Sequence, residues 1–282
     1  MSGALTIATM TRAEVDFAVG LAAAEGWNPG LHDATPFHAT DPDGFLIGRI
    51  DGEPIGCISG VSYGGTFGFI GLYIVVPAQR GKGHGIALWR AAMARLAGHN
   101  VGLDGVLAQQ ANYRRSGFAL AYSNVRFERS GALALPSPKD TVALGTMPFE
   151  TLRDFDRRFF PAERATFLRA WIAQPESRGL AAVVNGAIAG YGVIRRSSVG
   201  WKIGPLFATS ASVADTLYRA LCANVTTDEP VYLDVPDINR EGMALAQRYG
   251  MRQVFGTARM YTGETPALPI EQIYGVTTFE LG

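Results

Sequence analysis

Cysteine is scarce in this sequence of 282 residues, and neither sign of charge is in excess. Its 2 cysteines, Cys57 and Cys222, are too few for a disulfide framework and are not spaced as metal ligands. Each stands in an apolar run, so we expect both to be small core residues. Lysine plus arginine and aspartate plus glutamate both number 25, and residues 1–130 and 131–282 are each balanced as well. The sequence therefore lacks the basic surface typical of nucleic-acid-binding proteins.

Long apolar runs are missing too. No stretch of about 18 apolar residues could span a membrane, and the N-terminus lacks the basic and then apolar composition of a signal peptide. We therefore expect a cytoplasmic protein without a membrane partner. Hydrophobic residues still make up 48% of the chain, which is enough for packed cores, and a length of 282 residues favours two domains.

Turn residues and hydrophobic periodicity predict a regular order of elements in the first half. Over residues 5–129 we expect strand, helix, three hairpin-linked strands, helix, strand, helix and strand. Residues 31–43 are expected to be a loop with one helical turn. Residues 131–140 contain 2 prolines and no clear period, and we interpret them as a linker.

After this linker the same order restarts, although the two halves are not close in sequence. A helix is expected over 161–173, a second three-strand meander over 179–207, and a final alternating strand over 273–281. The sequence thus predicts an α/β (α+β) fold of two tandem domains, 1–130 and 131–282. Each would have a mixed, mostly antiparallel sheet flanked by helices.

The stretch from Val75 to Gly85 is the one that indicates chemistry. It reads Val-Val-Pro-Ala-Gln-Arg-Gly-Lys-Gly-His-Gly and joins an expected strand to an expected helix. Its three alternating glycines remove the Cβ atoms that would hold a ligand away from the backbone. The backbone N–H groups of Arg80 through Gly85 can then point at one anion at the positive end of the helix, as in a pyrophosphate site. Arg80 and Lys82 could add positive charge at the rim.

The spacing of these glycines differs from that of two other phosphate-binding loops. Rossmann domains use G-x-G-x-x-G, whereas this loop has G-x-G-x-G after Gln79-Arg80, and the P-loop ending Gly-Lys-Ser/Thr is absent. The antiparallel meander before the loop and the lack of an acidic residue at the expected position also disfavour a dinucleotide-binding oxidoreductase. A tight turn that binds nothing is the simpler alternative.

The pattern V-x-P-x-x-R-G-x-G-x-G resembles the acyl-CoA pyrophosphate-binding motif of the GNAT N-acetyltransferases. The resemblance covers about residues 5–129 in element order and continues at Tyr113–Phe118, where the tyrosine stands four residues before Gly117 as in the family's signature. Gln109 replaces the alanine that begins this signature. The resemblance implies that the fourth and fifth strands splay apart and that acetyl-CoA, or another acyl-CoA, binds there as co-substrate without a metal.

The resemblance also assigns roles to residues. The cofactor-binding residues would be Tyr73, Ile74 and Val75 on the strand and Arg80, Gly81, Lys82, Gly83, His84 and Gly85 in the loop. Tyr113 would be the general acid that protonates the leaving thiolate, since a phenol of pKa ~10 suits a thiol of pKa ~8.5. A packing role at the end of its helix is the alternative for Tyr113.

The sequence does not identify a general base, because the expected fourth strand has no acidic residue. The candidates are His32 and Asp33 in the first loop, Asp104 on the fifth strand and Asp234 in the second half. His84 is expected to face solvent or phosphate. His32 and His38 have no third partner, so we expect no metal site.

The second half lacks the residues that indicate chemistry in the first. Residues 204–213 stand where the first half has its Gly-rich loop but contain no Gly triplet, and Ala246 takes the position of the tyrosine. We therefore expect acyl-CoA to bind to the first half alone, while the second half walls the acceptor site or stabilises the first. Asp234, Asp237 and Arg240 could meet a polar acceptor, but an exposed loop of solvated charges is the simpler interpretation.

Together these features predict an N-acyltransferase that moves an acetyl or other acyl group from acyl-CoA to a primary amine by direct attack. A non-catalytic, CoA-binding sensor or regulatory module is the alternative. We expect a small-molecule amine as the acceptor, and an amino acid, an antibiotic and a protein lysine all stay open.

Overall fold

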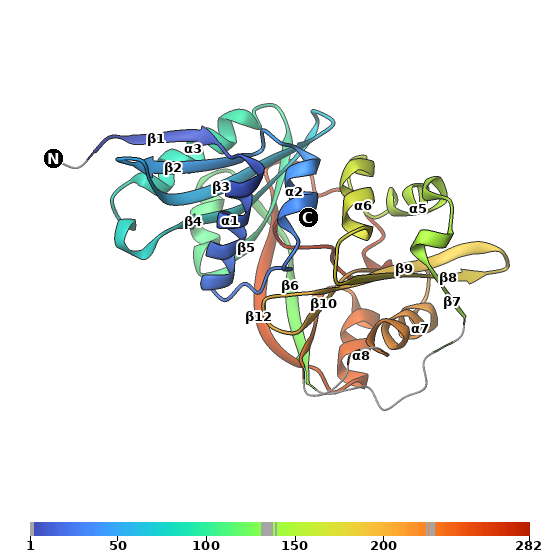
Figure 1. Cartoon of the computed structure of the whole chain (residues 1–282). Coiled ribbons are helices and arrows are strands. Elements are labelled where there is room, and N and C mark those ends of the chain that lie inside the picture. Colours follow the sequence, from blue (N-terminus) through green and yellow to red (C-terminus); the bar gives the residue numbers. More distant parts are fainter. Residues whose placement is uncertain (1–2, 131–137, 139, 224, 226–228) are drawn as a thin grey trace.

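The computed structural model describes the chain except for residues 1–2, 131–137, 139, 224 and 226–228, so most of the expected linker lies outside the described residues (Figure 1). The strands of the first half are β1 (Leu5–Thr9), β2 (Phe45–Ile50), β3 (Glu53–Tyr63), β4 (Phe67–Val75), β5 (Asn100–Val106) and β6 (Ala119–Arg129). Its helices are α1 (Arg12–Ala24), α2 (Ala34–Thr40), α3 (His84–Arg95) and α4 (Gln110–Arg115).

The second half repeats this order. Its strands are β7 (Thr141–Ala143), β8 (Ser177–Val184), β9 (Ala187–Arg196), β10 (Trp201–Ala208), β11 (Val231–Pro236), β12 (Arg252–Tyr261) and β13 (Ile273–Gly275). Its helices are α5 (Phe149–Asp156), α6 (Ala165–Ile172), α7 (Ala211–Cys222) and α8 (Arg240–Arg248). The predicted α/β fold, with two GNAT-like halves of mixed and mostly antiparallel strands, is confirmed. None of the helices in the described part of the chain is long and apolar enough to cross a membrane.

Three local predictions are wrong. The loop expected over 31–43 contains α2, a helix of 7 residues. The helix expected from Pro161 begins at Ala165, because the Arg164 side chain turns inward to a buried ion pair with Asp156. The strand expected over 273–281 ends at Gly275, because the chain then leaves the sheet edge and is buried on all sides as it crosses to the first half.

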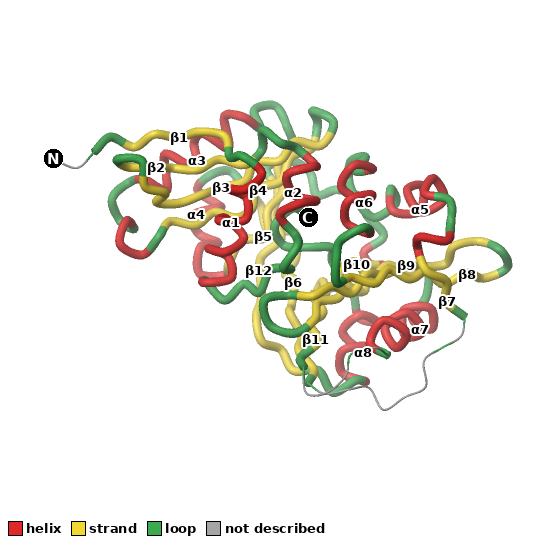
Figure 2. Tube along the Cα trace, in the orientation of Figure 1, coloured by secondary structure: helices red, strands yellow, loops and turns green. Residues whose placement is uncertain are grey.

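The two halves share one sheet. In the described part of the chain the sheet has 13 strands. Twelve follow the order β1-β2-β3-β4-β5-β12-β6-β11-β10-β9-β8-β7, and β13 pairs with β10 outside this order. β12 of the second half lies antiparallel between β5 and β6 of the first, and β6 in turn pairs antiparallel with β11. Figure 2 shows these strands running through the middle of the molecule, with α1, α3 and α4 of the first half on one side and the helices of the second half on the other. The halves are therefore joined by exchanged strands as well as by the chain.

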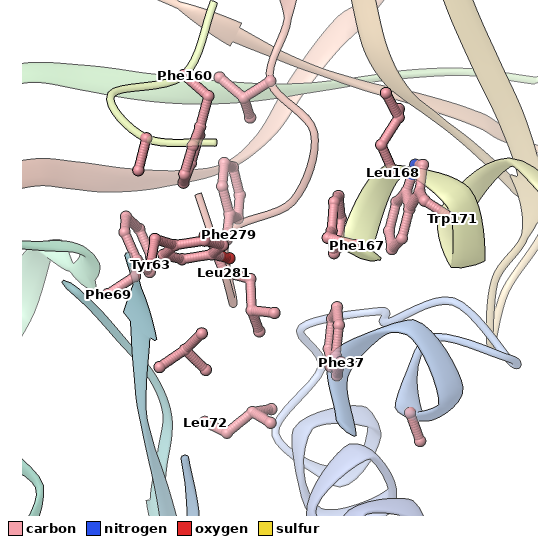
Figure 3. Close-up of a cluster of buried hydrophobic side chains, with 14 of the residues drawn as sticks. Phe37, Tyr63, Phe69, Leu72, Phe160, Phe167, Leu168, Trp171, Phe279 and Leu281 are labelled. Atoms are coloured by element: carbon pink, nitrogen blue, oxygen red, sulfur yellow. The ribbon is translucent and has the colours of Figure 1, made fainter. Parts of the chain in front are cut away.

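A hydrophobic core also joins the halves. It places side chains of α1, α2, β3 and β4 against those of α5, α6 and the last segment of the chain. Phe37 of α2 stacks on Trp171 of α6 with ring centroids 6.3 Å apart, and Tyr63 of β3 meets Phe160 at 4.8 Å (Figure 3). Separate cores lie under α3 and between α7, α8 and the sheet. Cys57 and Cys222 are both buried, which confirms their expected place in the core.

Candidate active site

The candidate site lies where β4 and β5 separate. These parallel neighbours pair only as far as Ile70 and Leu103, and beyond this point β5 stays paired with β12 on its other edge alone. β4 also carries a bulge, since Leu72 and Tyr73 oppose the single residue Ile58 on β3, and Leu72 has a φ of 46°. A cleft of about 710 Å³ opens between the separated strands. One side of β4 therefore offers backbone hydrogen-bonding groups to the cleft rather than to a strand.

The Gly-rich loop forms one end of this cleft and leads into α3. Gly81 and Gly83 have φ angles of 75° and 86°, in the left-handed region that favours glycine, and a Cβ on either would meet nothing within 4 Å. Within the described residues, no hydrogen bond is donated by the backbone N–H groups of residues 81 to 86. Arg80 differs from expectation, because its N–H donates to Pro77 O at 3.2 Å. The row of unpaired donors thus begins at Gly81, at the positive end of a 12-residue helix.

The charged side chains of the loop are held by neighbours rather than free. Arg80 Nε donates to Val75 O at 2.8 Å, and its Nη2 forms an ion pair with Glu25. Lys82 Nζ donates to Gln79 Oε1 at 3.0 Å. Of the predicted cofactor-binding residues, the cleft is lined by Tyr73, Ile74, Val75, Arg80, Gly81 and Gly85, and not by Lys82, Gly83 and His84. Their binding roles stay predictions.

Tyr113 of α4 also lines the cleft. Its ring packs directly on β5, where a Cβ on Gly105 would come within 2.2 Å of it. Trp89 of α3 lies between Tyr113 and Tyr73, with ring centroids 5.7 Å and 5.5 Å away. Burial, with a smaller effect of Tyr73, raises the pKa of Tyr113 to about 12. The phenol therefore keeps its proton at neutral pH and can act as a donor in the cleft.

In the structure, each general-base candidate from the sequence already forms an ion pair or hydrogen bonds with another side chain. Asp33 is fully buried in an ion pair with Arg195, and His32 lies 3.0 Å from Glu176 near the surface. Asp104 lines the cleft, but both of its oxygens accept hydrogen bonds from the Arg259 guanidinium. These three side chains are therefore poor candidates for a free base.

The interpretation of Asp234 as a solvated loop residue is wrong, because it is 2% exposed on β11. Its carboxylate accepts hydrogen bonds of 2.7 and 2.8 Å from Arg126. Burial by itself would raise the pKa of Asp234, but the Arg126 guanidinium lowers it below the ordinary value. Asp237 and Arg240 are exposed, as the simpler interpretation expects.

The sequence did not indicate the inner wall of the cleft, which comes largely from outside the motif. Trp27 follows α1, Phe255 and Thr257 belong to β12, and Phe279 and Glu280 belong to the last segment. Four of these five residues come from the second half: two reach the cleft because β12 is exchanged, and two because the last segment crosses to the first half. One signal was present, since Glu280 is the one charged residue in the stretch from Ile273 to Gly282.

The second half has a counterpart of the splayed strands, but its own chain fills the gap. β10 and β11 pair in parallel as far as Ile203 and Leu233 and then separate. β13 enters there and pairs antiparallel with β10, so that Gly275 faces Leu206. Ala246, in the position of the tyrosine, is fully buried. A strand of the protein thus takes the edge that stays open in the first half.

Comparison with known proteins identifies the family. A model of the acetyltransferase (GNAT) family matches residues 11–118, and a model of an acetyltransferase (GNAT) domain matches residues 152–275. The chain belongs to the GNAT acetyltransferase family and contains two GNAT domains in tandem. It is 30% identical over 261 residues to holothin acyltransferase of Pseudoalteromonas sp. (strain SANK 73390). The aligned region covers 93% of this chain and 89% of that protein.

Solved structures share the fold over nearly the whole chain. A presumed acetyltransferase from Pyrococcus horikoshii has a TM-score of 0.84 at 22% identity, over 99% of this chain and 96% of that chain. A tandem GNAT protein from the clavulanic acid biosynthesis pathway has a TM-score of 0.65 at 16% identity, over 93% of this chain and all of that one.

Proposed function

We propose that this protein is an acyl-CoA-dependent N-acyltransferase that transfers an acetyl or other acyl group to a small primary amine by direct attack. The observation that carries the proposal is the cleft between β4 and β5, which ends at the unpaired N–H groups of residues 81 to 86. Such donors at a helix N-terminus suit the pyrophosphate of CoA. The glycines at 81 and 83 keep the space in front of them open.

The rest of the cleft suits the remainder of an acyl-CoA. Beyond Ile70, the side of β4 that faces the cleft pairs with no strand in the described part of the chain, so an extended pantetheine with its amides can add along this edge. The bulge at Leu72 turns the backbone at the inner end of this edge. In the proposed reaction, a backbone N–H there polarises the thioester carbonyl.

Two groups of this chain then serve the transfer. The cleft holds amine and thioester together, and such proximity supplies a large part of the rate. The amine nitrogen attacks the carbonyl carbon, the carbon–sulfur bond breaks, and Tyr113 gives its proton to the departing sulfur. Burial keeps Tyr113 protonated, which supports this role.

The acceptor is the part of the proposal that needs a screen. The relative named holothin acyltransferase covers almost the whole chain, so holothin is the first acceptor to test. The protein is incubated with acetyl-CoA and a panel of small amines, amino acids and a lysine peptide. Release of the CoA thiol is followed over time, and the mass of the product is measured by mass spectrometry. We expect acceptor-dependent release of CoA with a small amine. Binding of acetyl-CoA without transfer to any acceptor would favour a sensor instead.

A further inference from the structure

Aromatic side chains line the inner end of the cleft, and the buried Arg126 guanidinium packs against them. Trp27, Phe255 and Phe279 line it, and the last two rings have centroids 6.4 Å apart. The Arg126 guanidinium lies 4.8 Å from the Phe279 ring and 5.5 Å from the Phe255 ring, and it donates to Trp27 O at 2.5 Å. The buried ion pair of Arg126 with Asp234 holds this cation in place. These walls are therefore built to a fixed shape.

Three acidic residues line the cleft in the described part of the chain, and they differ in what holds them. Glu25, at the Gly-rich loop, is paired with Arg80. Asp104 is held by Arg259 through both oxygens. Glu280 has no ion pair within the described residues, and its one side-chain partner there is the Thr278 hydroxyl, which donates to Oε2. Glu280 is thus the acid of the cleft that is free to meet a ligand.

The second oxygen of Glu280 reaches open space although the residue is only 3% exposed. Oε1 accepts no hydrogen bond from the described residues, and it is not among their buried atoms without a partner. It therefore keeps some accessible surface, and Glu280 is among the residues that line the cleft. Two buried cations, Arg126 and Lys202, interact electrostatically with this carboxylate.

Glu280 lies at the bulge of β4. A Cβ on Gly71 would come within 2.0 Å of Glu280 O, so the absence of a side chain at Gly71 lets the last segment lie directly on this strand. The same bulge is where the proposed function places the thioester carbonyl. The backbone of Glu280 is therefore next to the point at which an amine has to attack.

We propose that Glu280, contributed by the second half of the chain, is the general base that receives the acceptor's ammonium group, and that the acceptor is a compact amine with an aromatic or apolar body. The proposal rests on the proposed function. Glu280 takes one proton from the ammonium, directly or through a water, and the freed lone pair forms the carbon–nitrogen bond. The carbon–sulfur bond breaks, Tyr113 protonates the sulfur, and the second nitrogen proton returns to Tyr113. One proton is released to solvent for each turnover.

The test compares two amines that differ in charge at neutral pH. Benzylamine is an ammonium there, whereas aniline is already neutral and needs no proton removed before attack. We expect Glu280→Gln to lower kcat/KM for benzylamine by at least about 10²-fold, the usual value of a general base, and to lower it far less for aniline. Glu280→Asp keeps the charge and should restore part of the benzylamine activity. Equal losses with the two amines would overturn the assignment.

Binding supplies a second readout that needs no turnover. We titrate benzylamine, and benzyl alcohol as its neutral counterpart, into protein with and without CoA. Glu280→Gln should weaken benzylamine about 10-fold or more, as expected for a lost charge-assisted hydrogen bond, and leave benzyl alcohol unchanged. Unchanged benzylamine affinity in the variant, or no benzylamine binding to the wild type, would overturn the proposal.

Two controls separate the possible failures. Glu271→Gln makes the same substitution at an exposed position of the same terminal region and should change neither amine. Acetyl-CoA affinity and melting temperature show whether Glu280→Gln is folded. If acetyl-CoA does not bind to the wild type, the proposed function fails, and the benzylamine titration of the protein alone still decides the role of Glu280.

Discussion

Tyr113 shows how burial sets the chemistry of a single side chain. The ring is enclosed by Gly105 and Trp89, and the pKa of its phenol is raised to about 12. The proton is therefore present at any pH at which the protein would work. Giving it to a thiolate whose thiol has a pKa of ~8.5 is uphill, so the transfer has to be coupled to the return of a proton from the attacking nitrogen.

Replacing Tyr113 with Phe keeps the ring and removes the donor. We expect turnover to fall about 10²-fold, at the low end for general acid catalysis because a thiolate is already a fair leaving group. Acetyl-CoA affinity should change little, since the ring still fills the same space. Single-turnover kinetics measure the chemical step without interference from product release. Tyr249→Phe, at a tyrosine of the second half bonded to Asp215, is the control. A Tyr113 variant within about threefold of wild type would leave this residue a packing role.

The buried Lys202 leads to a prediction of how the stability of the fold depends on pH. It is 2% exposed on β10, and burial, together with the nearby Arg126 cation, lowers its pKa to about 7. Asp234 and Glu280 oppose this shift, and Arg195 adds to it. Because the ordinary pKa of 10.5 applies in the unfolded chain, the unfolded state binds an extra proton between about pH 7 and 10.5. The lysine therefore destabilises the fold fully below pH 7, and this effect fades as the pH rises.

Lys202→Met removes this proton and keeps much of the side-chain volume. The variant should exceed the wild type in free energy of unfolding most at about pH 6, and the difference should shrink by about pH 9. Denaturant titrations of both proteins at the two pH values measure it. If this difference stayed constant or grew as the pH rises, the charge on buried Lys202 would not destabilise the fold.

At the scale of elements, the sequence predicted the turn from β4 into α3 well because it is local. A proline ends the strand, and glycines supply the left-handed φ angles that start the helix, so both signals lie within eleven residues. The unpaired N–H groups follow from this geometry. The inner wall of the cleft could not be predicted in the same way, since Phe255 and Glu280 are brought there by pairing between distant parts of the chain.

Gly83→Val tests the loop as an anion site. At a φ of 86° valine is strained, and its side chain would enter the open space in front of the helix N-terminus. We expect acetyl-CoA binding to be abolished in calorimetry on a folded variant. Gly98→Val is a matched control, because Gly98 has a φ of 84° and open surroundings too, but follows the C-terminal end of α3 instead of preceding its N-terminus. If Gly83→Val bound as tightly as Gly98→Val, the loop would not be the pyrophosphate site.

β13 explains at the same scale why the second half is expected to bind no cofactor. It occupies the edge of β10 that corresponds to the open edge of β4. A pantetheine would have to displace this strand and the buried segment after it. We therefore expect one acyl-CoA per chain, bound along residues 73–85. Native mass spectrometry with increasing acetyl-CoA counts the ligands, and two specifically bound equivalents would contradict the prediction.

For the whole molecule, the order of elements was accessible from sequence, whereas their pairing was not. Hydrophobic periodicity and turns report on neighbours in the chain, and each half reads as a complete unit by these signals. β12 nevertheless lies between β5 and β6, since antiparallel partners are chosen by contacts that no local pattern encodes. The boundary at residue 130 stays a prediction. Whether residue 130 separates two independent domains depends on whether each half folds without the other.

The exchanged strands lead us to expect that the halves unfold together. Opening the second half would take β12 away from β5 and β6, and opening the first would leave β11 without β6. Hydrogen exchange read by mass spectrometry at increasing denaturant follows peptides of β2–β3 and β9–β10 separately. Both sets should open at one denaturant concentration. Acetyl-CoA at about 100 times its Kd should protect both by about 2.7 kcal/mol, although it binds to the first half alone. Separate openings, or protection confined to first-half peptides, would mean that each half is a folding unit despite the shared sheet.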